Sequence, residues 1–485
     1  MIGLGRQAGI LAFARFASYA LMLISPVILV RLLPVEQFGE YREFILYTSF
    51  LSLVAAFSFN ESLLYFVPAH ANSPWRVVRQ TNFLTACSSG IVIALLLVAD
   101  FASHGHVVGK LLWPLVAYVL LFVNLDCWEY FLLATHRPGS VFLYSGGRMI
   151  ARMFVVIMMA LLTADVNKII WSLVVLEIVR FTGSAVLLRR LDRSASEASI
   201  AGAMSAQLRY CIPAGLGMLL YMANRNLGNF AVAKILGAAA LAQYSIGTYG
   251  EYAYLAVGNS IALVLLPEMV RRNTASPGGG LALWRRATIV YCILLFPIAI
   301  LVARYAEPLV LVVFSPRYRP AIIVLKIHML FMIRGCFDFS PALRAINKTR
   351  PFIFSNLTAL VCSAAGLYWL LPGAGLAGAI STLVVSSVVE AAVLGWWTVF
   401  FYKVSVAELI PWKEIFKVGS AALGASLFII SSLWTQYLGF AGVVIASLVF
   451  AVVFVVLLRA MKVSEAGFIL EKIKRPMMSM VSRVG

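Results

Sequence analysis

The residues of this sequence with the clearest chemical potential are ionisable side chains inside long apolar segments. A charged side chain at the centre of a bilayer costs at least about 2.5 to 3.5 kcal/mol, so each should face a partner or a wet cavity. Arginine or lysine placed there could bind an anion such as a phosphate through charge-assisted hydrogen bonds. A carboxylate could carry a coupling proton, because burial favours its protonated form.

Arg225 is the most prominent of the cations. It lies in an apolar segment beside Asn224, Asn226 and Asn229, and no acid stands three or four residues away. One interpretation is a cavity-facing cation for a diphosphate or an acidic sugar; the other is a structural ion pair with Glu251 of the next apolar segment. The sequence leaves both interpretations open.

Three further groups of charges have local explanations. Arg334 and Asp338 are four residues apart and are expected to neutralise each other, which leaves Lys326 as the freer cation of that segment. Glu177 and Arg180 are three apart and are expected to pair in the same way.

Arg148 and Arg152 share one face at the start of an apolar segment. Snorkelling to the cytoplasmic interface is the preferred interpretation, and a clamp at the substrate entrance is the alternative.

The candidate residues fall into two sets. The substrate-binding candidates are Arg225, Lys326, Arg334, Arg148, Arg152, Asn224 and Asn229. The coupling-ion candidates are Glu61, Asp126, Glu129, Glu251 and Glu390, for which a role as paired counter-ions is an equally good interpretation. His104 and His106 alone do not complete a metal site, so the sequence predicts no metal, no cofactor and no catalytic residue.

Composition explains why these charges stand out. Of 485 residues, 62% are hydrophobic and 12% charged, which is more apolar surface than a soluble core of this length could bury. The net charge of +19 comes from Lys and Arg in short loops between apolar segments, so it indicates membrane topology rather than nucleic-acid binding. The chain is therefore predicted to be an all-α, polytopic membrane protein.

Fourteen apolar segments are long enough to cross a bilayer. They lie at about 9–33, 44–68, 79–100, 111–134, 141–163, 166–190, 209–235, 241–266, 286–305, 319–343, 351–371, 374–402, 414–434 and 437–459. Basic residues alternate between rich and poor loops, which places both termini in the cytoplasm.

These segments group into lobes. We predict an N-terminal six-helix lobe (1–192), a cytoplasmic linker (193–208), a C-terminal six-helix lobe (209–403), two added helices (404–460) and a basic cytoplasmic tail (461–485). An internal echo supports two repeated halves: RLLPVEQFGEY at 31–41 is matched by KILGAAALAQY at 234–244.

These two motifs, together with SPRYRPA at 315–321 and GAGLAGAISTLVVSS at 373–387, resemble Wzx-type polysaccharide flippases of the multidrug/oligosaccharidyl-lipid/polysaccharide exporter superfamily. The likeness covers about residues 9–459. One departure is that Pro34 follows Leu33 directly, where the family usually has a glycine before the proline.

The resemblance implies two six-helix lobes around a central cavity. It also implies alternating-access export, across the inner membrane, of undecaprenyl-diphosphate-linked repeat units for polysaccharides such as O-antigen or exopolysaccharide. The expected partners are this lipid-linked oligosaccharide and membrane lipids, and polysaccharide polymerase machinery is a further candidate.

Two other functions compete with export of a lipid-linked glycan. A cation-coupled drug exporter of the same superfamily would have an acid-lined cavity, whereas Arg225 and Lys326 favour an anionic cargo. A membrane-embedded glycan polymerase or ligase would usually have a large loop or a dense acid/His site, which this sequence lacks.

Overall fold

The computed structural model describes residues 24–70, 73–105, 107–135, 137–192, 203–276, 278–427, 433–463 and 465. Within these ranges the chain is helical and has no strand, which confirms the predicted fold class. Most of the first predicted span, the linker up to residue 202 and nearly all of the basic tail lie outside the described residues.

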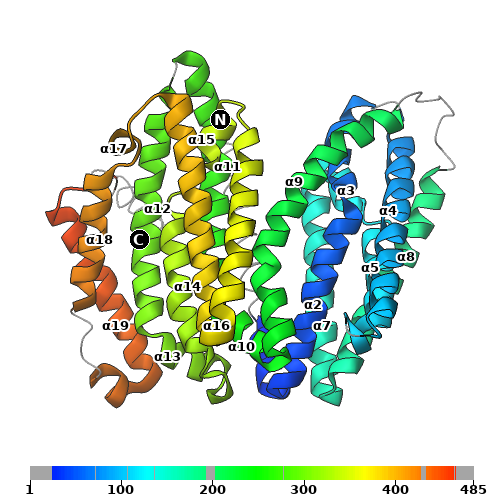
Figure 1. The fold of residues 1–485 in the computed structure, drawn as a ribbon, viewed down its shortest axis with the longest axis horizontal. Helices are drawn as coiled ribbons and strands as arrows, with labels where there is room; N and C mark the ends of the chain where they lie inside the picture. The colour runs from blue at the N-terminus through cyan, green and yellow to red at the C-terminus, as the bar shows by residue number, and fades with distance from the viewer. Residues whose placement is uncertain are drawn as a thin grey trace, which may run out of the picture. The chain divides into compact units, whose positions relative to one another are not determined.

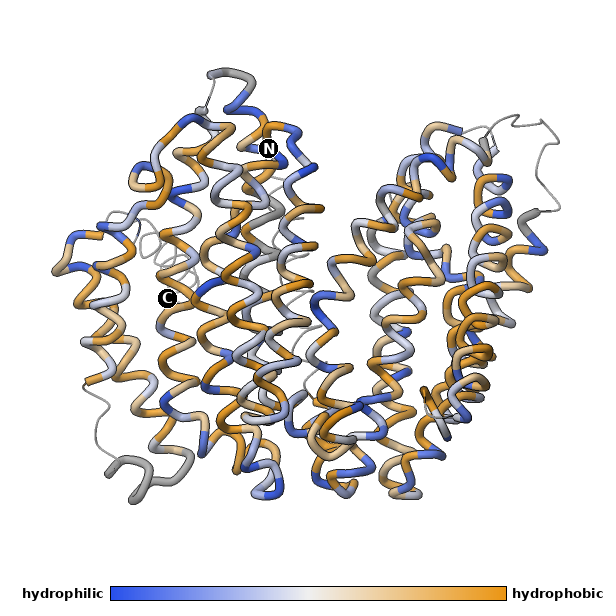
Figure 2. The backbone as a smooth tube through the Cα atoms, viewed as in Figure 1, coloured by the Kyte–Doolittle hydropathy of each residue, from blue (hydrophilic) through white to orange (hydrophobic). Residues whose placement is uncertain are grey.

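Eight of the described segments are long and apolar enough to cross a membrane: Val35–Ala69, Pro74–Ala102, Gly109–Ala134, Gly139–Thr163, Val166–Arg190, Gly279–Arg304, Arg350–Tyr402 and Ala441–Ala460. Figure 2 shows that the helices of the described chain are predominantly apolar along their lengths. A multi-pass membrane protein is thus confirmed, while the count of fourteen spans stays a prediction.

The described residues form two compact units, with the division between Ala242 and Gln243. We call them the N-terminal unit and the C-terminal unit. The helix α9 (Ala203–Ala231), which the sequence assigns to the second lobe, contacts α2 (Val35–Ala56) and α3 (Phe59–Ala69) and so belongs to the N-terminal unit. Compact units follow contacts whereas the predicted lobes follow a sequence repeat, so the lobe boundaries stay a prediction.

The N-terminal unit begins with a helix over 24–32. It continues through α2, α3, α4 (Pro74–Ala102), η1 (Gly109–Leu111), α5 (Leu112–Val123), α6 (Trp128–Ala134), α7 (Pro138–Thr163), α8 (Val166–Asp192), α9 and η2 (Val232–Leu236), and the chain leaves it within α10 (Ala238–Gly247) (Figure 1).

Two predicted spans of this unit are broken. The span predicted at 44–68 divides into α2 and α3 at Phe57 and Ser58, which both adopt positive φ angles (41° and 60°). The span predicted at 111–134 divides into α5 and α6 over residues 124–127. Each break removes a turn of backbone hydrogen bonds, so the freed groups must find partners elsewhere in the protein.

The C-terminal unit contains the remaining helices. They are α11 (Glu251–Ala275), α12 (Gly279–Arg304), α13 (Ala306–Leu309), η3 (Val310–Phe314), η4 (Pro316–Tyr318), α14 (Ala321–Gly335), α15 (Ser340–Ala345), α16 (Arg350–Tyr402), α17 (Val406–Leu409), α18 (Trp412–Leu427) and α19 (Leu433–Ala460). The last two helices pack on α12 and on each other.

The 53-residue α16 is a hairpin rather than one rod. Gly375 has φ 53° and ψ −130°, which is not helical. A Cβ added at Gly366 would lie 2.7 Å from the Thr382 side chain, a residue that would be far away along a straight helix. The two arms therefore lie side by side, and they occupy the two spans that the sequence predicts at 351–371 and 374–402.

The two echoed motifs meet inside the N-terminal unit. A Cβ built on Gly39 would come 2.0 Å from the Ala238 carbonyl oxygen, so the backbones of α2 and the start of α10 touch directly. Only glycine allows this approach. The repeated segments thus form a packing contact with each other.

Candidate functional site

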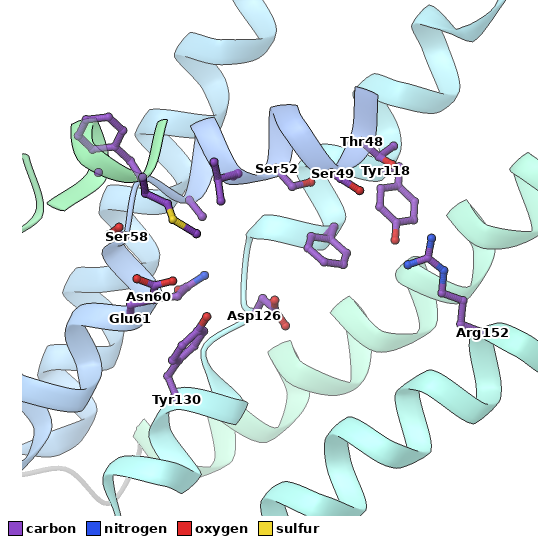
Figure 3. A pocket seen from close by; sticks show the side chains of 16 residues that line it. Thr48, Ser49, Ser52, Ser58, Asn60, Glu61, Tyr118, Asp126, Tyr130 and Arg152 are labelled. Carbon is purple, nitrogen blue, oxygen red and sulfur yellow. The ribbon is translucent and has the colours of Figure 1, made fainter. Parts of the chain in front are cut away.

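A polar cavity of about 340 Å³ lies within the N-terminal unit (Figure 3). Its polar lining comes from hydroxyl groups of α2, from both broken spans and from α7: Thr48, Ser49, Ser52, Ser58, Asn60, Glu61, Tyr118, Asp126, Tyr130 and Arg152. Asn60 and Glu61 follow the break between α2 and α3, and Asp126 lies in the break between α5 and α6. The two breaks therefore bring polar residues into the interior of an apolar bundle.

Arg152 is the basic residue of this lining. In Figure 3 its guanidinium and the Tyr118 hydroxyl face each other. Among the residues that the structure describes, no carboxylate lies within 4.0 Å of Arg152, although Asp126 and Glu61 line the same cavity. A guanidinium with five donors is thus directed toward a space of molecular size.

Four charged side chains, each at most 22% exposed, form a network next to the cavity. Arg148 contacts Asp126 at 2.7 Å and Glu177 at 3.7 Å, and Arg180 contacts Glu177 at 2.5 Å and Asp126 at 3.8 Å. The predicted pair of Glu177 and Arg180 is confirmed, but it is half of a larger network of alternating charge. Two acids and two bases compensate one another, as burial in an apolar environment requires.

The snorkelling interpretation of Arg148 and Arg152 is wrong. Because α7 begins at Pro138, both arginines lie near the middle of the helix rather than at its start. Arg148 turns to the acids of α8 and of the α5–α6 break, and Arg152 lines the cavity.

Arg180 also donates hydrogen bonds to the backbone where the span of α5 and α6 is broken. From α8 its guanidinium donates to the carbonyl oxygens of Leu121, Phe122 (2.9 Å), Asn124 (3.3 Å) and Leu125 (3.3 Å). These are the last carbonyls of α5 and the first of the break, which have no partner within their own helix. A cation at a helix C-terminus also interacts favourably with the helix dipole. Arg180 thereby fixes the break that carries Asp126.

Four other candidates of this unit are not part of the cavity lining. Gly215 and Met218 of α9 close one side of it, whereas Asn224, Arg225 and Asn229 lie further along α9 and are not part of the lining that the described residues provide. Asn224 is buried, with 7% of its surface exposed. The sequence alternative of an Arg225–Glu251 pair stays a prediction. Glu129, in α6, is partly buried and adjoins the lining residue Tyr130.

In the C-terminal unit the predicted pair of Arg334 and Asp338 is wrong. The helix α14 ends at Gly335, so Asp338 leaves the helical register and instead accepts a hydrogen bond from the Ser340 amide at 2.9 Å. Arg334 pairs with Glu390 at 3.3 Å and donates to the Ser387 carbonyl at 2.6 Å, both in α16.

The two remaining candidates of that unit are placed as follows. Lys326 lies on the exposed face of α14, and Glu251 is the first residue of α11. Whether the seven cationic and amide candidates and the five acids bind a substrate or a coupling ion stays a prediction.

Comparison with known proteins gives one family. A profile described as "polysaccharide biosynthesis protein" matches residues 28–323, more than half of the chain. This match confirms the resemblance drawn from the sequence motifs. No match was found among curated proteins.

Solved structures of the same fold are distant in sequence. The lipid II flippase MurJ in an inward closed conformation has a TM-score of 0.70 at 13% identity, over 93% of this chain and 99% of its own. An inward-facing MATE family multidrug transporter of the MOP superfamily has a TM-score of 0.58 at 14% identity, over 81% and 98%. A MOP superfamily transporter from Pyrococcus furiosus has a TM-score of 0.56 at 13% identity, over 82% and 95%.

Proposed function

Since the chain belongs to the polysaccharide biosynthesis protein family, we propose that it moves a polyprenyl-diphosphate-linked oligosaccharide across the inner membrane. Its fold, shared with the lipid II flippase MurJ and with MATE transporters, supports transport as the mode of action. The motif resemblance favours a more specific form of this proposal. The carrier lipid would be undecaprenyl diphosphate, transport would follow alternating access, and the product would be delivered to a polysaccharide polymerase. The observation that carries it is Arg152, a cation without a carboxylate partner in the described chain, directed into a polar cavity.

The part of the cavity around Arg152 suits a phosphate. Asp126 is one of the two acids that line the cavity, but Arg148 and Arg180 compensate its charge. Arg152 then supplies a positive charge that Asp126 does not cancel, and the hydroxyl groups of Thr48, Ser49 and Ser52 can donate to phosphate or sugar oxygens. The planar fork of arginine also matches two phosphate oxygens at once.

The direct test replaces Arg152. Each charge-assisted hydrogen bond to the cargo contributes about 1.5 to 3 kcal/mol, so Arg152→Ala should lower flipping per folded molecule at least tenfold. Arg152→Lys should keep partial activity, because it retains the charge without the fork. The measurement is the appearance of lipid-linked glycan in the outer leaflet of proteoliposomes, normalised to folded protein.

Arg317→Ala is the matched control, since this exposed arginine lies in the C-terminal unit, far along the chain from the cavity. Full activity of Arg152→Ala at normal abundance would reject the site. A loss that is explained entirely by lower abundance would assign Arg152 a structural role only.

Glu61 supports a second candidate, a cation-coupled exporter of the same superfamily. It is exposed within the same cavity and, unlike Asp126, it has no basic partner within 4.0 Å among the described residues. A cationic cargo or a coupling proton would need this carboxylate. If Glu61→Gln abolishes export of a cationic dye while Arg152→Ala leaves it unchanged, drug export replaces glycan flipping as the proposal.

A further inference from the structure

A second pocket, of about 430 Å³, lies at one end of the C-terminal unit. It forms where the end of α11, the turn before α12, the turn before α16 and the end of the α16 hairpin come together. Because α16 folds back at Gly375, its first and last turns lie at the same end of the unit. The pocket shares no residue with the cavity of the N-terminal unit.

Hydrogen bonds between these elements build the wall of the pocket. Asn273 accepts a hydrogen bond from the Gly280 amide at 2.9 Å and donates to the Tyr402 hydroxyl at 3.2 Å. Tyr402 in turn donates to the Ala342 carbonyl at 3.0 Å. Four segments are thus joined through two side chains, so the pocket has a fixed shape.

Two lysines lie at this pocket without compensating acids. Lys348 follows the turn residue Asn347, and Lys403 ends α16 in a left-handed conformation with φ 52°. Both are exposed, and neither has a carboxylate within 4.0 Å among the residues described. The Lys348 ammonium lies 5.2 Å from the centroid of the Phe401 ring, which holds it over the pocket wall.

Two arginines near this end are already engaged by an acid. Arg271 and Arg272 both bind Glu268, at 2.8 and 2.9 Å. Lys348 and Lys403, by contrast, line the pocket and are not compensated by an acid of the described chain.

The depth of the pocket is marked by an aromatic belt. Trp396 and Phe400 are 73% and 63% exposed, and Trp397 packs on Phe401, a residue of the pocket, with ring centroids 5.7 Å apart. Exposed tryptophan at the end of a membrane span is typical of the boundary between acyl chains and headgroups. A ligand of this pocket would thus be at headgroup depth.

We propose that this pocket binds the phosphodiester headgroup of an anionic phospholipid, with Lys348 and Lys403 at the phosphate. Basic pockets between membrane helices are suited to such headgroups. The volume exceeds that of a phosphate alone and leaves room for a glycerol moiety beside the Phe401 ring. The inference concerns the lipid environment and does not depend on which cargo the protein transports.

The test measures binding of short-chain phosphatidylglycerol to the purified full-length protein in a zwitterionic detergent. The double variant Lys348→Gln/Lys403→Gln should lose at least tenfold in affinity. Lys348→Arg/Lys403→Arg retains both charges and should bind within about threefold of the parent protein, which follows from charge being the main determinant at an exposed site. Binding by Lys348→Arg/Lys403→Arg would also show that the pocket still folds when both lysines are replaced.

Lys413→Gln/Lys462→Gln is the matched control, since it removes the same charge from two exposed lysines elsewhere in this unit. An equal loss of affinity in the control would show nonspecific attraction and overturn the proposal. Short-chain phosphatidylcholine should bind at least tenfold more weakly than phosphatidylglycerol. Competition by millimolar inorganic phosphate would instead indicate a small-anion site and would also overturn it.

Discussion

At the scale of single residues, Arg148 and Arg152 show how one turn of helix separates two roles. Both lie near the middle of α7. Arg148 is held by Asp126 and Glu177, and its Cζ lies 4.5 Å from the centre of the Phe122 ring, so its charge is compensated. Arg152, four residues on, meets Tyr118 and the cavity instead. Pairing with acidic side chains, rather than depth in the bundle, therefore distinguishes a structural arginine from a binding candidate.

The charge network predicts a specific pattern of stability. Asp126→Asn removes one of two acids that neutralise Arg148 and Arg180, and leaving a buried charge uncompensated costs about 3 to 5 kcal/mol. The variant should therefore unfold at a markedly lower temperature in detergent. The double variant Asp126→Asn/Arg148→Gln should recover part of the loss, because the charges balance again. If the stability lost in the double variant equals the sum of the losses in the Asp126→Asn and Arg148→Gln single variants, a coupled network is contradicted.

Sequence alone could identify these charges but not all of their partners. Spacing of three on one helix is sufficient to predict the Glu177–Arg180 pair. The contacts of Arg148 with Asp126, and of Arg334 with Glu390, depend on how neighbouring helices are rotated and aligned, which spacing does not determine. One signal was available: Gly335 marks a helix end, and it would have separated Arg334 from Asp338.

At the scale of elements, the sequence predicts one interruption of a long apolar run well and the two broken spans poorly. The hairpin turn of α16 could be predicted, because Pro372 and Gly373 interrupt the apolar run. Phe57 and Ser58 are neither glycine nor proline, and positive φ angles are uncommon for residues of these types. The second break has a weak signal in the polar residues Asn124 and Asp126. The cavity was missed because it depends on these breaks.

The contact between the two echoed motifs predicts a sensitive position at Gly39. A methyl group there would overlap the Ala238 backbone, so Gly39→Ala should separate α2 from the start of α10 and destabilise the protein by about 1 to 3 kcal/mol. Thermal unfolding in detergent measures the effect. Gly90→Ala is the control: this exposed helical glycine has nothing within 4 Å of an added Cβ, so the change should be neutral or slightly stabilising. Equal behaviour of the two variants would contradict the role of Gly39.

At the scale of the whole molecule, composition and hydropathy were sufficient for the class of protein, and short motifs were sufficient for its family. Inside a bilayer the backbone N–H and C=O groups must be hydrogen-bonded within the protein. Apolar segments long enough to cross the bilayer achieve this as helices, so the helical class follows from them. The grouping of helices into units does not, since it depends on contacts such as those of α9 with α2 and α3.

The proposed orientation gives a prediction for the intact protein. The loops rich in Lys and Arg are expected to face the cytoplasm, including the turn between α11 and α12, whereas the loop before α5 is expected to face outward. In a background without native cysteines, Lys110→Cys should react with an impermeant maleimide added to intact cells, and Ser276→Cys should react only after permeabilisation. Both positions are exposed in the structure. Labelling of Ser276→Cys in intact cells would contradict the orientation.

The hydrogen bonds that Arg180 donates also constrain how this protein is made. The carbonyl groups freed where α5 ends receive them from a residue 55 to 59 positions later in the chain. Because the chain is made from its N-terminus, the segment of α5 and α6 leaves the ribosome before Arg180 of α8 does. Until α8 arrives, these carbonyls need water or a temporary continuation of the helix across residues 124–127. We therefore expect the break, and with it the cavity, to be completed only when the sixth predicted span packs against the fourth.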